Sequence, residues 1–168
     1  PLVASENTII GNTVLYGATD GFLFAAGRAG ERFSVRNSGA KTVIEGCGSN
    51  GCEYMTGGIA VILGNIGANF GAGMTGGMAY LYDPEGNTDL MMNMETLVTC
   101  RVTVEHWEKE LKALVQLHAN ETGSIKATKI LQHWDQEIES FVQVCPKEML
   151  VHLPEPLTED IVQSLPAE

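Results

Sequence analysis

The sequence predicts a mainly β protein: a parallel β-helix (β-solenoid) of about four coils, followed by a C-terminal helical hairpin. Seventeen of the nineteen glycines lie between Gly11 and Gly77. Within this stretch the chain repeats at a step of nineteen residues, so that Met55-Thr56-Gly57-Gly58 returns as Met74-Thr75-Gly76-Gly77. After residue 82 glycine becomes scarce and charge increases, which indicates a second kind of structure.

The length of the repeat decides which architecture it can form. A strand, a crossover helix and two loops need about 30 residues, whereas nineteen suit short strands joined by turns. The apolar runs are short and β-rich, as in Ile59-Ala60-Val61-Ile62-Leu63, and we expect glycine to supply the left-handed backbone at each corner. Collagen does not fit, because glycine does not recur every third residue. Folded at this step, the chain would stack one apolar column: Phe24, Val43, Ile62 and Leu81.

A turn-forming cluster, Tyr82-Asp83-Pro84-Glu85-Gly86-Asn87, ends the repeat. It predicts a boundary between a glycine-rich β-helix over residues 1–82 and an α-helical extension with a tail over residues 83–168. The tail contains Pro154, Pro156 and Pro166 and should hold at most one short helix, near Thr158 to Leu165.

Two helices are expected in the extension. Thr103 should cap the first, whose positive N-terminal end suits Glu105 and Glu108. Its apolar face comprises Val104, Trp107, Leu111, Leu114 and Val115. Ser124 should cap the second, which would stop before Cys145-Pro146. The apolar face of the second helix comprises Ala127, Ile130, Leu131, Trp134, Ile138 and Phe141. The shared face of this hairpin would bury against the flank of the solenoid or cover its open end.

Charge and hydropathy restrict the function. The net charge is −11, and residues 83–168 carry sixteen acidic and six basic side chains, while residues 1–82 carry five and four. An acidic chain without a basic stripe disfavours nucleic-acid binding. The apolar runs are far shorter than the roughly 20 residues of a membrane span, and no signal sequence begins the chain, so we expect a cytoplasmic protein.

Glycine-rich loops suggest a cofactor site that the surrounding sequence does not support. Residues 46–51 and 71–76 both match the G-x-G-x-x-G pattern of dinucleotide-binding proteins. That pattern works by opening a helix whose N-terminus binds the pyrophosphate, yet both matches continue into β-rich or glycine-rich sequence. We therefore expect repeated corners and no cofactor-binding residues in this chain.

Cysteines and histidines give no metal pattern. Cys47 and Cys52 lie five residues apart, Cys100 and Cys145 are isolated, and buried, inert thiols are the expected state. The histidines at positions 106, 118 and 133 have no spacing that converges on one ion, and we expect them partly exposed on helix surfaces. No nucleophile and base pair is evident, so the sequence predicts neither a catalytic nor a metal site.

One polar cluster stands out within a single coil. Residues 27–37 contain Arg28, Glu31, Arg32 and Arg36. Either the three arginines form a surface ion-pair network with Glu31, Glu45 or Glu53, or the cluster is a docking surface for a partner domain. Asn50 and Asn69, one repeat apart, are expected to stack at a corner of the solenoid.

Five stretches carry a family resemblance: GNTVLYGAT (residues 11–19), AGRAGERF (26–33), VRNSG (35–39), GCEYMTGG (51–58) and NFGAGMTGG (69–77). Together they resemble the C-terminal glycine-rich (GXGXG) domain of the glutamate synthase large (alpha) subunit, and the likeness extends to about residue 150. In that family the domain is a right-handed parallel β-helix.

The resemblance implies a place in glutamate biosynthesis. In that family glutamine is hydrolysed in an amidotransferase domain, ammonia travels through a tunnel, and 2-oxoglutarate is aminated in a flavin (FMN) barrel fed through an iron–sulfur cluster and an electron-donating small subunit. The glycine-rich domain is a scaffold there, so no catalytic residue carries over. The resemblance also implies further coils before the position of Pro1, and hence a truncated chain that self-associates through its open end.

Two function classes remain open from the sequence. The chain is either a fragment of a large oxidoreductase or a free-standing β-helix subunit that binds separately encoded partners, as in split glutamate synthases or the similar β-helix protein of formylmethanofuran dehydrogenase. An independent enzyme is the third interpretation, which would require turnover or a flavin spectrum from the chain alone.

Overall fold

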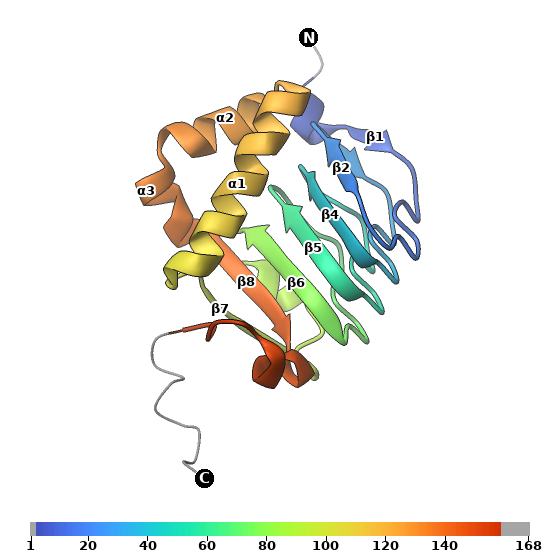
Figure 1. Ribbon diagram of the computed structural model, residues 1–168. Helices are drawn as coiled ribbons and strands as arrows, with labels where there is room; N and C mark the ends of the chain where they lie inside the picture. The colour runs from blue at the N-terminus through green and yellow to red at the C-terminus, as the bar shows by residue number, and fades with distance from the viewer. Residues whose placement is uncertain (1–2, 159–168) are drawn as a thin grey trace.

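A β-solenoid of about four coils forms the body of the protein in the computed structural model, which describes residues 3–158 (Figure 1). Four parallel strands lie side by side along one flank: β2 (Phe22–Ala25), β4 (Ser38–Ile44), β5 (Thr56–Ile62) and β6 (Gly76–Tyr82). A separate two-stranded parallel sheet joins β1 (Thr8–Ile10) to β3 (Arg28–Ala29). The expected tail helix lies outside the described residues apart from Thr158.

Alternation along the strands divides the core in two. Side chains of one set, such as Ile44, Ile62 and Leu81, point into the solenoid and pack with Phe33 and Phe70. Their neighbours in sequence point to the other side of the sheet, where Val43, Val61 and Tyr80 meet the helices. Both faces of these strands are therefore buried, which explains their continuous apolar runs.

The expected apolar column was wrong at one step. The register stacks Phe24, Val43, Val61 and Tyr80 in one column and places Ile62 and Leu81 in the next. After a register shift early in β4 and β5, the step is eighteen residues from β4 to β5, whereas it is nineteen from β2 to β4 and from Ile59 onward between β5 and β6. Because side chains alternate between faces, an error of one residue moves a side chain to the opposite side of the sheet.

Each coil turns through three alternate residues with a left-handed backbone. They are residues 13, 15 and 17, then 32, 34 and 36, then 50, 52 and 54, and finally 69, 71 and 73. Nine of these twelve positions are not glycine, so the expectation that glycine supplies each left-handed corner was wrong for this corner. The stacked coils impose the conformation, as in the backbone hydrogen bonds from Arg32 to Ser49 and from Asn50 to Ala68 (2.8 and 2.9 Å).

The sheet continues beyond residue 82 with two antiparallel strands, β7 (Leu97–Arg101) and β8 (Phe141–Pro146), in the order β2-β4-β5-β6-β8-β7. The expectation of a helix running past Phe141 was therefore wrong, because the apolar run from Phe141 to Cys145 pairs with β6 and β7. Short 3-10 helices occupy Ala4–Glu6, Thr88–Met91, Ile138–Ser140 and Lys147–His152.

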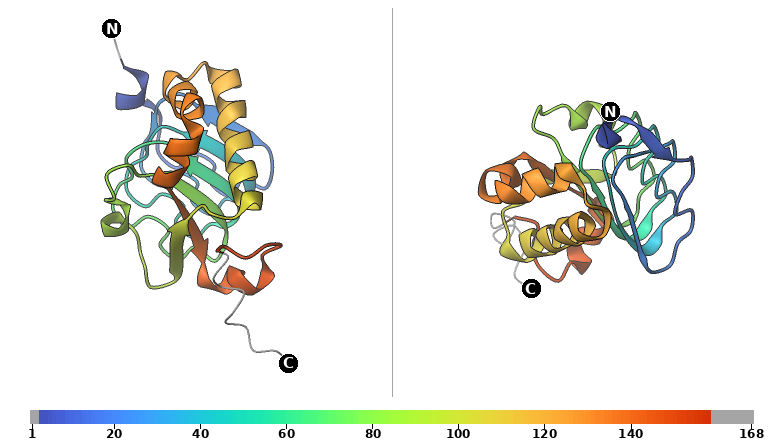
Figure 2. Two further views of the ribbon diagram at one scale, coloured as in Figure 1. Left: turned by 90° about the vertical axis from the view of Figure 1, so that its left-hand side faces the viewer. Right: turned by 90° about the horizontal axis from the view of Figure 1, so that it is seen from above.

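Three α-helices cover the flank of the sheet, as Figure 2 shows from above: α1 (Glu105–Thr122), α2 (Ile125–Gln132) and α3 (Trp134–Glu137). The predicted apolar face of α1 is confirmed, since Trp107, Leu111, Leu114 and Val115 are buried. Its N-cap is Val104 rather than Thr103, without a side-chain hydrogen bond. The predicted cap of α2 is confirmed, because Ser124 Oγ accepts a hydrogen bond from the Ala127 amide (3.0 Å).

None of the α-helices within residues 3–158 is both long and apolar enough to cross a lipid bilayer.

Candidate docking surface and buried polar cluster

The four expected docking residues follow one another along a single coil but lie in different surroundings. Arg28 belongs to β3 and is half-buried, whereas Glu31, Arg32 and Arg36 are exposed in the following turn. The side chain of Arg28 covers Gly46, where a Cβ atom would lie 3.1 Å from Arg28 Cγ. The structure therefore places Arg32 and Arg36 on the left-handed corner and directs Arg28 toward the next coil.

An arginine–tyrosine stack marks the left-handed corner. Arg36 Cζ lies 5.9 Å from the centroid of the Tyr54 ring. Tyr54 in turn covers Gly73, where a Cβ atom would lie only 2.4 Å from the ring. Tyr54 and Tyr16 are 53% and 60% exposed. Arginine and tyrosine are enriched at the centres of protein–protein interfaces.

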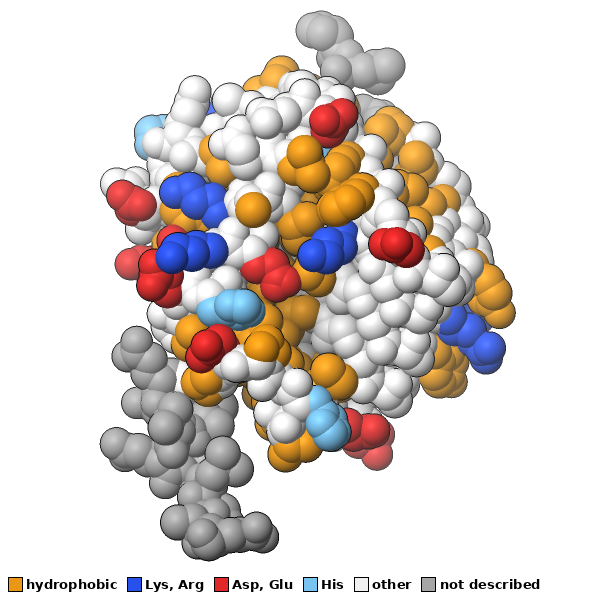
Figure 3. Space-filling model, viewed as in Figure 1, with side chains coloured by type: hydrophobic (Ala, Val, Ile, Leu, Met, Phe, Trp, Pro, Cys, Tyr) orange, Lys and Arg blue, Asp and Glu red, His pale blue; other side chains and the backbone are white. Residues whose placement is uncertain are grey.

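The aromatic part of this corner was missed from the sequence. Tyr54 follows Arg36 by eighteen residues, the true step between these two coils, so a count of nineteen does not align them. Arg32 Nε lies 3.8 Å from Glu53 Oε2, but the Arg32 side chain is 58% exposed and such a pair contributes little stability. Figure 3 shows basic and hydrophobic side chains side by side at the right-hand edge of the molecule.

A buried polar cluster connects the solenoid to the helical layer. Glu45 follows β4 and is 3% exposed, and its Oε1 accepts a hydrogen bond from Ser124 Oγ at the start of α2. His118 of α1 is fully buried, with Nε2 at 3.7 Å from Glu45 Oε1. The expectation of a partly exposed histidine was therefore wrong at position 118, although His106 and His133 are exposed.

Electrostatics hold the Glu45 carboxyl in its charged form. Burial alone would raise the pKa of Glu45, but the nearby His118 side chain, the hydrogen bond from Ser124 and the charge of Lys126 lower it below its usual value. The cluster contains the residue types of a hydrolase triad in a different arrangement. The Ser124 hydroxyl donates to the carboxylate and caps α2, so it is committed to the fold. We interpret the cluster as a structural connection between the solenoid and the helices. No local sequence pattern predicts it.

The cysteines are free thiols in protected surroundings. Burial raises the pKa of Cys47 and of Cys145 to about 12 and that of Cys100 to about 11. Burial raises the pKa of the enclosed Cys52 thiol as well. Since the thiolate is the reactive form, these groups are poor nucleophiles at neutral pH. Within residues 3–158 no three His, Cys, Asp or Glu side chains converge as metal ligands.

The two fingerprint-like loops are corners of the solenoid. The second match ends at Gly76, the first residue of β6, so it leads into a strand. The predicted asparagine stack is confirmed, because Asn69 Nδ2 donates to Asn50 Oδ1 at 3.4 Å.

Comparison with known proteins identifies the family of this chain. The family model described as GXGXG motif matches residues 1–147. The glutamate synthase [NADPH] large chain of Azospirillum brasilense is 58% identical over 166 residues, which cover 95% of this chain and 11% of that protein. Ferredoxin-dependent glutamate synthase 2 of Synechocystis is 55% identical over 126 residues, 75% of this chain and 8% of that protein. Ferredoxin-dependent glutamate synthase 1 of Arabidopsis thaliana is 53% identical over 129 residues, 77% and 8% of the two chains.

The chain thus spans about a tenth of the length of the relatives it matches. The resemblance drawn from the glycine-rich motifs is confirmed: this chain belongs to the GXGXG motif family, with glutamate synthase large chains among its relatives.

Proposed function

We propose that this chain is a non-catalytic scaffold domain of a glutamate synthase large subunit, a cytoplasmic oxidoreductase of nitrogen metabolism. The observation that carries the proposal is the 58% identity to a glutamate synthase large chain over 95% of the present chain. On this proposal the solenoid is right-handed, and the remaining domains convert glutamine and 2-oxoglutarate to glutamate with channelled ammonia. FMN and the iron–sulfur cluster are held in those domains.

The chemistry of the buried side chains supports a scaffold role. The Glu45, His118 and Ser124 side chains meet between two layers of the fold, where they join the solenoid to the helices. The thiols of Cys47 and Cys145, with pKa values raised to about 12, are protonated at neutral pH. These side chains therefore contribute to the fold rather than to chemistry, as expected for a domain that positions others.

We assign the docking of the partner domains to the arginine coil, residues 27–37. Arg32 and Arg36 are exposed on a corner that also presents Tyr16 and Tyr54, while most of the acidic charge of the chain lies after residue 82. The partners are the amidotransferase and flavin-barrel domains of the same subunit and, beyond them, the electron-donating small subunit. Arg28, which is half-buried, and Glu31, which is exposed, belong to the same proposed surface.

The test replaces Arg28, Arg32 and Arg36 by alanine in the complete large subunit. We expect glutamine-dependent activity to fall by about tenfold or more, with increased protease sensitivity between domains, because central arginines contribute about 2 kcal/mol or more to an interface. Lys129→Ala, on the exposed face of α2, removes a positive charge outside the proposed surface and should leave both readouts unchanged. Wild-type activity and domain association in the triple variant would disprove the docking assignment.

A further inference from the structure

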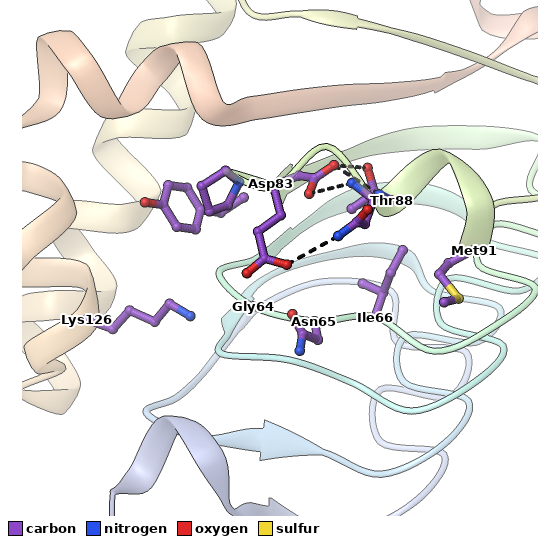
Figure 4. Close-up of a pocket in the computed structure, with 11 residues that line it drawn as sticks. Gly64, Asn65, Ile66, Asp83, Thr88, Met91 and Lys126 are labelled. Carbon is purple, nitrogen blue, oxygen red and sulfur yellow. Dashed lines mark hydrogen bonds between the residues drawn. The ribbon is translucent and has the colours of Figure 1, made fainter.

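A polar pocket lies where the solenoid, the loop after β6 and the helical layer meet (Figure 4). Its volume is about 380 Å³, within the range of small-molecule sites. One wall is the corner Gly64-Asn65-Ile66, a second is the loop from Tyr82 to Met91, and a third is Lys126 of α2. Segments far apart in the sequence therefore build one site, which the docking surface does not include.

Lys126 supplies a cation to this pocket. Figure 4 shows its side chain reaching from α2 toward Gly64 and Asn65. The lack of a side chain at Gly64 makes room for it, since a Cβ atom there would lie 3.3 Å from Lys126 Nζ. Burial lowers the pKa of Lys126, and the ring of Tyr82 lies 5.9 Å from Nζ. Among the described residues no carboxylate approaches this ammonium within 4.0 Å.

The negative charge that acts on Lys126 through space is already committed to other partners. Glu45 raises the pKa of Lys126 through space, yet its carboxylate accepts the Ser124 hydroxyl and faces His118. The positive charge of Arg28 acts through space on Lys126 and lowers its pKa further. A half-buried ammonium that lacks a close hydrogen-bonded anion is costly to maintain, so an anionic group of a ligand would stabilise it.

An acidic wall faces the same space. Asp83 is committed to the loop itself, because it accepts hydrogen bonds from the Asn87 amide (3.0 Å) and the Thr88 amide and hydroxyl (3.0 and 2.8 Å). Glu85 is exposed and accepts one hydrogen bond, from Asn87 Nδ2 at 3.2 Å. Within the described part of the chain, Lys126 and Glu85 thus line one pocket with opposite charges and form no ion pair within 4.0 Å.

We propose that this pocket binds a free α-amino acid in its zwitterionic form. The ligand carboxylate meets Lys126, the ligand ammonium meets Glu85, and an apolar side chain lies against Ile66 and Met91. The acidic wall opposes a dicarboxylate or a phosphate, whereas a zwitterion satisfies both walls. This proposal stands independently of the scaffold role.

Isothermal titration calorimetry tests the proposal, with L-methionine titrated into the whole polypeptide that the gene encodes. We expect saturable binding that weakens about tenfold or more with N-acetyl-L-methionine, which lacks the ammonium, and with L-methioninamide, which lacks the carboxylate. Lys126→Met and Glu85→Gln should each weaken binding of L-methionine about tenfold. Lys129→Met and Glu121→Gln, which change exposed charges on α2 and α1, should bind as the wild type does.

Three results would overturn the proposal. They are an absence of binding up to about 10 mM L-methionine, equal binding of the two blocked analogues and L-methionine, or unchanged binding in both pocket variants. Thermal unfolding of every variant identifies any that fails to fold. If Lys126→Met does not fold, binding is compared between the wild type and Glu85→Gln, which changes an exposed position. Because L-methionine has no part in glutamine chemistry, failure of this test and failure of the scaffold proposal are separate results.

Discussion

Nine non-glycine residues in the left-handed region are the main local departure from ordinary backbone preference. Each such residue costs roughly 1–2 kcal/mol relative to the right-handed conformation. The cost is offset because each corner hydrogen-bonds to the next coil, as Arg36 N does to Glu53 O at 2.9 Å. A single residue such as Arg36 or Tyr54 gives no sign of this conformation, since the stacking of whole coils imposes it.

Gly73→Ala is expected to destabilise the protein more than Gly17→Ala. Both glycines are left-handed, with φ of +63° and +62°, so each substitution should cost roughly 1 kcal/mol of backbone strain. Only at Gly73 would the new Cβ meet the Tyr54 ring, at 2.4 Å, whereas nothing lies within 4 Å at Gly17. We expect a further loss of about 1 kcal/mol or more in the free energy of unfolding, measured in urea.

The same comparison in a Tyr54→Ala background separates strain from overlap. Without the ring, the two glycine substitutions should cost the same free energy of unfolding. A persistent difference between Gly73→Ala and Gly17→Ala in that background would show that the ring does not cause it.

The Glu45 carboxylate should make stability depend on acid pH. Its folded pKa is lowered, so its contribution is fully present above its unfolded pKa of about 4.3 and is lost as pH falls through the folded pKa. We expect Glu45→Gln to lower the free energy of unfolding by about 2–3 kcal/mol at pH 7. Urea denaturation between pH 3 and 8, at roughly half-unit steps, should show the gap to wild type closing in acid.

Glu121→Gln on the exposed side of α1 provides the control and should show no gap at any pH. A gap for Glu45→Gln that widens in acid would contradict the assigned charge state.

Sequence reasoning at single residues succeeded where the interaction is local or repeats with the coil. The Ser124 cap needs only its own turn, and Asn50 and Asn69 are one coil apart, so both followed from the sequence. The burial of His118 did not follow, because it arises where α1 packs against the solenoid: Phe24 and Glu45 lie close to His118 in the fold but 94 and 73 positions before it in the sequence. Partners so distant leave no periodic signal.

Among the elements, the start of α2 should depend on Ser124 and the start of α1 should not depend on Thr103. Ser124 Oγ caps α2 and also donates to Glu45, so Ser124→Ala removes the cap and leaves a buried carboxylate with one partner fewer. We expect a loss of about 2–3 kcal/mol in the free energy of unfolding. Thr103→Ala should change it by less than about 0.5 kcal/mol, because Val104 occupies the N-cap and Thr103 is exposed.

Thermal or urea unfolding of the two variants checks this directly, with Ser124→Asn as a second replacement that retains capping ability. Equal losses for Ser124→Ala and Thr103→Ala would show that neither cap assignment is right.

The sequence predicted a helix well where apolar residues recur over several turns. It predicted secondary structure poorly where pairing with distant strands decides between helix and strand. The predicted apolar face of α1 recurs at helical spacing, and four of its five residues, Trp107, Leu111, Leu114 and Val115, are buried on the helix, while Val104 is the N-cap. The run from Phe141 to Cys145 continued a helical spacing from α2, yet it pairs with β6 and β7 as strand β8. A short, mostly apolar run fits both patterns, and pairing with β6 and β7 selects the strand.

At the scale of the whole molecule, the solenoid is unevenly closed. Strand β8 covers one edge of the parallel sheet, whereas β2 forms the opposite edge with no neighbour within the described chain. Apolar side chains are exposed on this first coil, with Ile9 at 52%, Tyr16 at 60% and Phe22 at 62%. An uncovered edge with apolar side chains favours association with another chain.

We therefore predict that the isolated 168-residue chain self-associates through its first coil. Phe22→Lys places a charge on the edge strand and should weaken association about tenfold or more, because a charge at the centre of such a contact must be desolvated. Sedimentation velocity and light scattering over a range of micromolar concentrations measure the change. Leu90→Lys, which replaces an 84% exposed side chain in the loop far along the sequence, should associate as the wild type does. Of these two residues only Phe22 lies on the open edge of the sheet. Equal effects of the two substitutions would therefore place the association elsewhere, and a strictly monomeric wild-type chain would show that the chain does not self-associate.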